Sequence, residues 1–177
     1  MPRMPRTPKQ AAAFNKAVLA PWRRQLILGA QGNPKPLLAN AITALREAPE
    51  WAGILWFDAF HQRTIIRGRA PWMAARVDEY WTDMHDVLAA DWLQHEDIAV
   101  SPDVTGQAVE AVAREQRFHP VLDYLDRCRW DGEPRLDLWA VRFLGAEDTP
   151  FVRAVSPRWM ISAVARVTNP GAKPIAR

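Results

Sequence analysis

The sequence predicts an α+β fold, with a small N-terminal unit that holds a β-hairpin and a helix, followed by a mainly α-helical bundle. Two observations lead to this prediction. Apolar runs of hairpin-strand type occur before residue 70, at 54–57 and 64–66, and the connection between them has the length of a hairpin loop. After residue 70, apolar side chains recur at helical spacing between proline and glycine boundaries.

Three segments follow from these patterns. Residues 1–19 are predicted to be a basic flexible tail or a short helix, residues 20–76 the small α+β unit, and residues 77–177 the helical region. The whole chain has 177 residues, which is enough for one ordinary domain or two small ones.

The α+β unit begins with a short apolar run at Leu26–Leu28, which predicts a brief strand. Asn33 and Pro34 then have the residue types of a helix start, with asparagine as N-cap and proline in the first turn. Apolar residues follow at helical spacing until Pro49, which is expected to end this helix before the hairpin.

The helical region is predicted from start signals and apolar stripes. Thr82, Ser101 and Thr149 have the N-cap residue type, and a proline follows two of them. Pro157 lies inside the last helix, where it either kinks the helix or splits it. Two stripes are expected to be buried, namely Met84, Leu88 and Trp92 with Val87 in one helix, and Leu136, Trp139, Phe143 and Leu144 in the helix before Gly145.

Charge is strongly segregated along the chain, although the net charge is only +3. Residues 1–40 carry seven Lys or Arg and no acid, whereas residues 77–110 carry nine acids and no Lys or Arg. The basic first part can approach a polyanion and the acidic block would be repelled by one. If the protein contacts nucleic acid, we therefore expect the acidic block to face away from it.

The second hairpin strand is the best candidate for such a contact. Strand alternation places Arg63 and Arg67 on one side, and the same direction continues to Arg69. Three guanidiniums on one face can contact successive phosphates in a salt-sensitive, sequence-independent mode. The alternative is an edge strand whose charges prevent aggregation. The candidate nucleic-acid-binding residues are Arg63, Arg67 and Arg69, with Arg23, Arg24 and Lys35 as an extension of the same basic surface.

The nine tryptophans allow two interpretations, base stacking and core packing. Core packing is favoured for Trp51, Trp56, Trp92 and Trp139, because they lie on or beside strand and helix patterns. Trp72 follows a proline close to the arginines, and it is the tryptophan least clearly assigned to the core, with contact to a partner as the alternative.

No metal site, cofactor or catalytic residue is predicted. Cys128 is the only cysteine, and the four histidines are scattered without a metal-ligand spacing. Several acids of the acidic block fall on the polar face of a predicted helix, whereas catalytic metal sites gather carboxylates around a cleft. No motif of a catalytic nucleophile occurs in the sequence.

Three stretches, in order, resemble one known family. They are Asn33-Pro-Lys-Pro with its helix and Pro49-Glu-Trp-Ala-Gly-Ile-Leu, then 118–137, and then 144–173. Together they resemble the virulence-associated protein E family of prophages and pathogenicity islands, over roughly residues 20–173. In that family this region precedes a superfamily 3-type P-loop helicase ATPase and often follows a primase-type domain. The resemblance implies DNA, a P-loop ATPase/helicase domain or other replication proteins as partners.

The P-loop chemistry of the family has no counterpart in this sequence. A P-loop lysine is followed by Ser or Thr, which binds Mg²⁺. The four lysines here, Lys9, Lys16, Lys35 and Lys173, are followed by Gln, Ala, Pro and Pro. We therefore expect that this chain is not an enzyme.

Two functional hypotheses remain open. The first is a non-catalytic N-terminal module of a mobile-element DNA replication protein, which contacts DNA through the basic hairpin. The second is a protein-interaction or oligomerisation element without nucleic-acid binding, or a truncated remnant. No apolar run approaches the ~20 residues of a membrane span, and no signal-peptide core follows the basic N-terminus, which predicts a cytoplasmic protein without a membrane partner.

Overall fold

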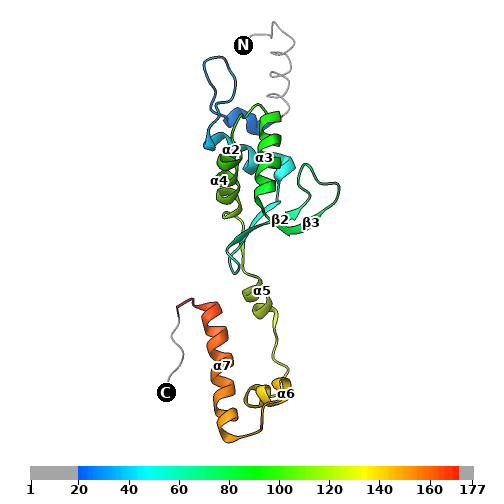
Figure 1. The fold of residues 1–177 in the computed structure, drawn as a ribbon, viewed down its shortest axis with the longest axis vertical. Helices are drawn as coiled ribbons and strands as arrows, with labels where there is room; N and C mark the ends of the chain where they lie inside the picture. The colour runs from blue at the N-terminus through cyan, green and yellow to red at the C-terminus, as the bar shows by residue number, and fades with distance from the viewer. Residues whose placement is uncertain (1–19, 172–177) are drawn as a thin grey trace. The chain divides into compact units, whose positions relative to one another are not determined.

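The structure is a computed structural model that describes residues 20–171 (Figure 1). The tail or helix predicted over residues 1–19 lies outside the described residues. The described chain forms two compact units, one up to Phe118 and one from His119 onward. Helices and a four-stranded sheet occur together, so the α+β prediction is confirmed.

The first unit alternates helices with short strands. Its elements are the 3-10 helix η1 (Pro21–Gln25), α2 (Leu38–Glu47), the 3-10 helix η2 (Pro49–Trp51), β1 (Leu55–Asp58), β2 (Arg63–Gly68), β3 (Val77–Tyr80), α3 (Asp83–His95), α4 (Pro102–Ala113) and β4 (Arg117–Phe118). The second unit contains α5 (Pro120–Arg127), the 3-10 helix η3 (Leu136–Leu138), α6 (Trp139–Leu144) and α7 (Pro150–Thr168).

The sheet has the order β3-β2-β1-β4. β1 and β2 form the predicted antiparallel hairpin, with Leu55 opposite Ile66 and Asp58 opposite Arg63. β3 pairs antiparallel to β2, and β4 adds a two-residue parallel strand beside β1. These two outer strands were not predicted, and they make the sheet wider than the expected hairpin.

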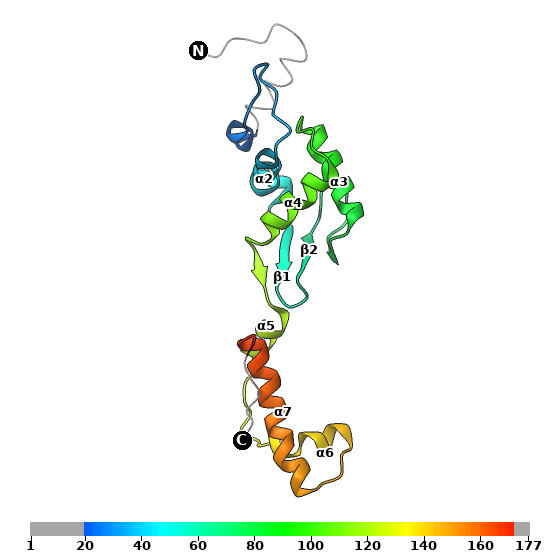
Figure 2. The same ribbon diagram turned by 60° about the vertical axis from the view of Figure 1, so that its left-hand side comes forward.

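Helices of the first unit lie on one side of this sheet. α4 packs against β1 and β2, and α2 and α3 pack against α4 (Figure 2). The side chains of Leu55, Phe57 and Ile66 point into this layer and are almost fully buried. Since side chains alternate along a strand, the residues between them point to the other side. We call that side the open face; register places on it Trp56, Asp58, Arg63, Ile65, Arg67, Asp78, Tyr80 and Phe118.

A tryptophan cluster lies in and beside the core. Trp51 is buried, and its ring centroid lies 5.6 Å from that of Trp72, 6.3 Å from that of Trp81 and 5.5 Å from that of Trp92. The core assignment is therefore confirmed for Trp51, and Trp72 and Trp92 are half-buried against the core. Trp56 is half-buried as well, but it points to the open face, so its assignment to the core was wrong.

The local start signals predicted helix starts well, with one exception. Thr82, Ser101 and Thr149 are the N-caps of α3, α4 and α7, and α7 continues through Pro157. The helix expected from Asn33 begins only at Leu38. Prolines disfavour helical conformation in the residue before them, and Pro34 and Pro36 follow each other closely. The strand predicted at Leu26–Leu28 does not form; Leu28 makes only an isolated antiparallel bridge with Pro34.

The predicted buried stripes were partly wrong. α3 buries Ala89, Ala90 and Leu93, while Met84 and Val87 are exposed. The small alanine side chains allow α3 to pack closely against α4, and this packing determines which side of α3 is buried. In the second unit Leu136, Phe143 and Leu144 are exposed, because the described part of this unit has no further layer to cover them. Trp139 is half-buried: its ring packs 5.1 Å from that of Trp159, and its Nε1 donates to the Ser156 carbonyl at 2.8 Å.

Candidate nucleic-acid interface

Two of the six candidate residues, Arg63 and Arg67, share the open face. Arg69 follows the end of β2 and is exposed, and its Nε donates to the Met73 carbonyl at 3.0 Å. Arg69 therefore contacts the loop that follows β2, and it does not belong to the strand residues that form the open face.

The remaining three candidates belong to other surfaces. Arg23 is 9% exposed; it forms an ion pair with the Glu96 carboxylate and donates to the Glu96 carbonyl at 3.1 Å. Burial lowers the pKa of Arg23, against the opposing effect of nearby acids. Arg24 and Lys35 are exposed. The segment before α2 that carries Lys35 lies at the opposite end of the unit from the β1–β2 turn (Figure 1).

The Arg67 guanidinium lies over two aromatic rings. Its Cζ lies 5.0 Å from the centroid of the Trp56 ring and 4.6 Å from that of Phe118. The two rings pack edge to face at 6.3 Å, and Trp56 Nε1 donates to the Gly53 carbonyl at 2.9 Å. A guanidinium stacked on aromatic faces keeps its N–H groups available at its rim. Three adjacent strands, β2, β1 and β4, thus contribute to one cation–aromatic cluster on the open face.

A third aromatic ring, that of Tyr80, lies at the β3 edge of the open face. Tyr80 lies opposite Ile65, and the Arg63 Cζ is 5.6 Å from the centroid of its ring. Tyr80 is 36% exposed, and Arg63 is exposed as well. The open face therefore presents two arginines interleaved with three aromatic rings, those of Trp56, Phe118 and Tyr80.

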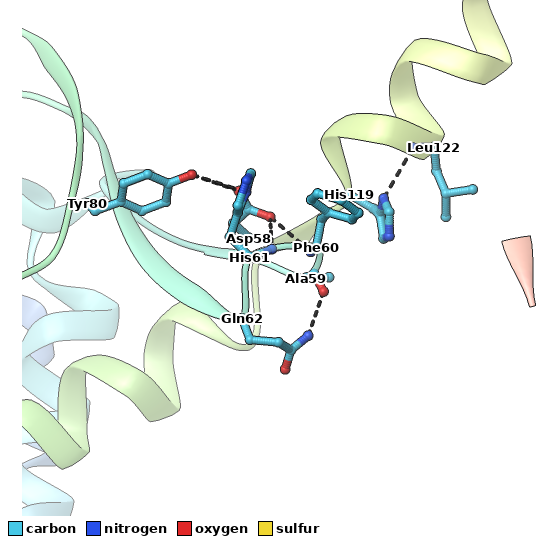
Figure 3. Close-up of polar contacts among 8 residues, drawn as sticks. All are labelled: Asp58, Ala59, Phe60, His61, Gln62, Tyr80, His119 and Leu122. Atoms are coloured by element: carbon cyan, nitrogen blue, oxygen red, sulfur yellow. Dashed lines mark hydrogen bonds and ion pairs between the residues drawn. The ribbon is translucent and has the colours of Figure 1, made fainter. Parts of the chain in front are cut away.

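A buried carboxylate fixes the end of this face near the β1–β2 turn (Figure 3). Asp58 Oδ1 accepts from the backbone N–H groups of Phe60 at 2.9 Å and His61 at 3.0 Å. His61 Nδ1 lies 2.7 Å from Asp58 Oδ2, and Tyr80 Oη lies 3.4 Å from the same oxygen and 3.1 Å from His61 Nδ1. Asp58 thus ties the turn to the tyrosine across the sheet.

The pKa directions follow from these contacts. Burial alone would raise the pKa of Asp58, but the hydrogen bonds from the His61 backbone and ring and from the Phe60 N–H outweigh it, so the pKa is lowered. Burial and the neighbouring Asp58 charge raise the pKa of Tyr80. Asp58 is therefore ionised at neutral pH and Tyr80 stays a neutral phenol.

Negative charge is sparse on the open face. Asp58 is buried, so Asp78, opposite Arg67, is the exposed acid among the residues that define the face. Glu79 points to the other side, 3.2 Å from His85 Nε2. Among residues 20–171 no group of three or more His, Cys, Asp or Glu side chains could hold a metal ion, and no helix is long and apolar enough to cross a bilayer.

The aromatic members of this face were missed at the sequence level. Tyr80 and Phe118 belong to β3 and β4, which were not predicted as strands, and Trp56 was assigned to the core. Val77–Tyr80 has two acids between a valine and a tyrosine, so apolar and polar residues do not alternate along β3 and the sequence gives no strand signal there. β4 is two residues long, which is too short for any periodicity.

Comparison with known proteins places the family resemblance in the second unit. Residues 125–174 match the model of the Virulence-associated protein E-like domain. The described part of this match runs from the last residues of α5 through η3, α6 and α7 to Gly171. No curated protein matches the chain. The chain is therefore similar to this domain over residues 125–174, which agrees with the last part of the predicted resemblance, while residues 20–124 lie outside the match.

Proposed function

We propose that this chain is a non-catalytic module of a mobile-element DNA replication protein, and that its first unit binds DNA through the open face. The observation that carries the proposal is the placement of Arg63 and Arg67 beside three aromatic rings on a sheet face that the helices of this unit leave uncovered. The virulence-associated protein E-like domain supports the association with mobile elements.

Electrostatics agree with this proposal. Guanidiniums donate to phosphate oxygens, and each phosphate contact releases counterions from the nucleic acid. The exposed acids Asp83 and Asp91 lie on α3, which packs on the helix side of the sheet. Most of the acidic block thus belongs to elements other than the open face, as expected for a surface that approaches a polyanion.

A salt titration of DNA binding tests the proposal. In the double variant Arg63→Ala/Arg67→Ala, the slope of log affinity against log salt should flatten by roughly 1.8 for duplex or 1.4 for single strands, because each lost contact contributes ~0.9 or ~0.7. Fluorescence anisotropy with labelled oligonucleotides measures the slope.

The matched control is Arg142→Ala/Arg158→Ala, which removes the same charge from two exposed positions in the second unit. This control should leave the slope close to that of the parent. Absence of binding at low salt, or equal slopes in the two double variants, would refute binding through the open face.

A second function is favoured by the surface of the second unit. Phe143, Leu144, Phe151 and Trp159 are each more than half exposed. Between α6 and α7 lies an apolar groove of about 470 Å³, lined by residues that include Trp139, Leu144, Phe151, Val155 and Trp159. Contiguous exposed apolar surface indicates a protein contact. We propose a P-loop ATPase/helicase domain as the partner that covers this groove.

A further inference from the structure

We propose that the open face is a platform for unpaired nucleic acid, on which bases stack against Tyr80 and against the Arg67 guanidinium, which lies over the Trp56 and Phe118 rings. This inference rests on the proposed function, that the open face binds nucleic acid, and adds the class of nucleic acid and the mode of contact.

The presence of aromatic rings on the open face favours single-stranded over duplex nucleic acid. Bases in a duplex stack on one another and hide their faces, whereas unpaired bases can stack on aromatic side chains or on arginine planes. A contact made only of phosphates would need no aromatic ring. The open face has rings on β3, β1 and β4. β3 and β4 are the two edge strands, so the rings extend across the whole width of the sheet.

The spacing of the strands suits successive bases. Neighbouring strands lie ~4.8 Å apart, so Tyr80 on β3 and Trp56 on β1 are separated by roughly 10 Å across β2. Arg63 lies between these strands on β2, where its exposed guanidinium can bind the phosphate that joins two bases. An extended strand that crosses the sheet would therefore meet a ring, an arginine and a second stacked plane in turn.

Both stacking positions are held in place before any ligand binds. Trp56 is fixed through its Nε1 bond to Gly53, and Arg67 rests on Trp56 and Phe118. The hydroxyl of Tyr80 contacts the buried Asp58 and His61. Side chains that are already ordered lose less conformational entropy on binding, which favours affinity at a small site.

The test compares a labelled oligothymidylate of about 15 nucleotides with a duplex of the same length, by fluorescence anisotropy. The parent chain should bind the single strand at least ~10-fold more tightly than the duplex. Tyr80→Leu should weaken single-strand binding roughly 5- to 100-fold, since base–aromatic stacking is lost. Tyr80→Phe keeps the ring and should retain most of the affinity.

Two further substitutions separate stacking from charge. Arg67→Lys keeps the positive charge but removes the planar group, so it should weaken single-strand binding and leave the salt slope unchanged. Asp78→Asn should tighten binding, because it removes the exposed carboxylate opposite Arg67. Tyr124→Leu, at a tyrosine that is 64% exposed in the second unit, is the matched control and should have no effect. A thermal melt of each variant confirms that it folds.

The outcomes distinguish this inference from the function on which it rests. Equal affinity for duplex and single strand, with Tyr80→Leu unchanged and the salt slope still dependent on Arg63 and Arg67, would overturn the stacking platform and leave DNA binding in place. Absence of binding to either oligonucleotide would overturn both.

Discussion

Asp58 shows how one residue can connect local structure with the candidate interface. Its side chain is 3% exposed, accepts two backbone N–H groups of its own turn, and contacts His61 and Tyr80. A buried carboxylate would be costly without such partners, and here every contact favours the ionised form. The stability of the turn and the position of the tyrosine on the open face therefore depend on the same charge.

Replacement of Asp58 tests this coupling. Asp58→Ala leaves buried donors without a partner and should cost about 1–3 kcal/mol of unfolding free energy. The lowered pKa in the folded protein means that the unfolded state takes up the proton first as pH falls. The contribution of the charge is therefore complete above the unfolded pKa of about 3.9 and is lost as pH falls through the folded value. Urea unfolding of the parent and of Asp58→Asn should show a stability gap at neutral pH that shrinks as the pH falls below the unfolded pKa of about 3.9. A gap that stays constant with pH would show that the charge is not responsible.

At the scale of elements, local sequence signals predicted the hairpin and several helix starts correctly, whereas the pairing of strands distant in the sequence was not predicted. The hairpin and the starts of α3, α4 and α7 depend on turn length, capping side chains and prolines, which a sequence displays directly. β4 pairs with β1 although a large part of the sequence of the first unit separates the two strands. Nothing in the sequence of either strand indicates its partner. The buried side of α3 depends on which helix packs against it, and apolar spacing alone predicted burial for Met84 and Val87, which are exposed, while Trp92 packs against the core.

The candidate site divides in the same way. The shared face of Arg63 and Arg67 followed from strand alternation, whereas Tyr80 and Phe118 required the two missed strands. Arg23 was predicted to bind nucleic acid on charge alone, but its ion pair with Glu96 arises from packing between distant segments. Tertiary packing decides which charges stay available, and the composition of a segment carries no information about it.

The groove between α6 and α7 leads to a prediction about partners. Leu144→Ser/Phe151→Ser removes two exposed apolar side chains from its lining and should weaken binding to a P-loop ATPase domain of the virulence-associated protein E family at least ~10-fold, as loss of buried apolar contact does at interfaces. Isothermal titration calorimetry measures the affinity, and Val87→Ser, at an exposed position on α3, is the control. If the parent chain binds no such domain but self-associates in sedimentation experiments, the groove serves an interface between copies instead.

For the whole molecule, the absence of a P-loop lysine in the sequence has a consequence for ATP chemistry. A phosphate-binding loop needs glycines for its turn, a lysine for the β- and γ-phosphates and a following Ser or Thr for Mg²⁺. Lys9, Lys16, Lys35 and Lys173 are followed by Gln, Ala, Pro and Pro, so none has this context. We therefore predict that the purified chain neither hydrolyses ATP nor binds a fluorescent ATP analogue, with or without DNA.

Phosphate release measured across the fractions of a tag-free preparation checks this prediction. A contaminating ATPase would give an activity peak displaced from the protein peak, so position along the gradient separates contamination from intrinsic turnover. Activity that coincides with the protein through two different columns would contradict the prediction. In that case arginines would be the first candidates for phosphate ligands, and the Arg63→Ala/Arg67→Ala and Arg142→Ala/Arg158→Ala variants would test the two units separately.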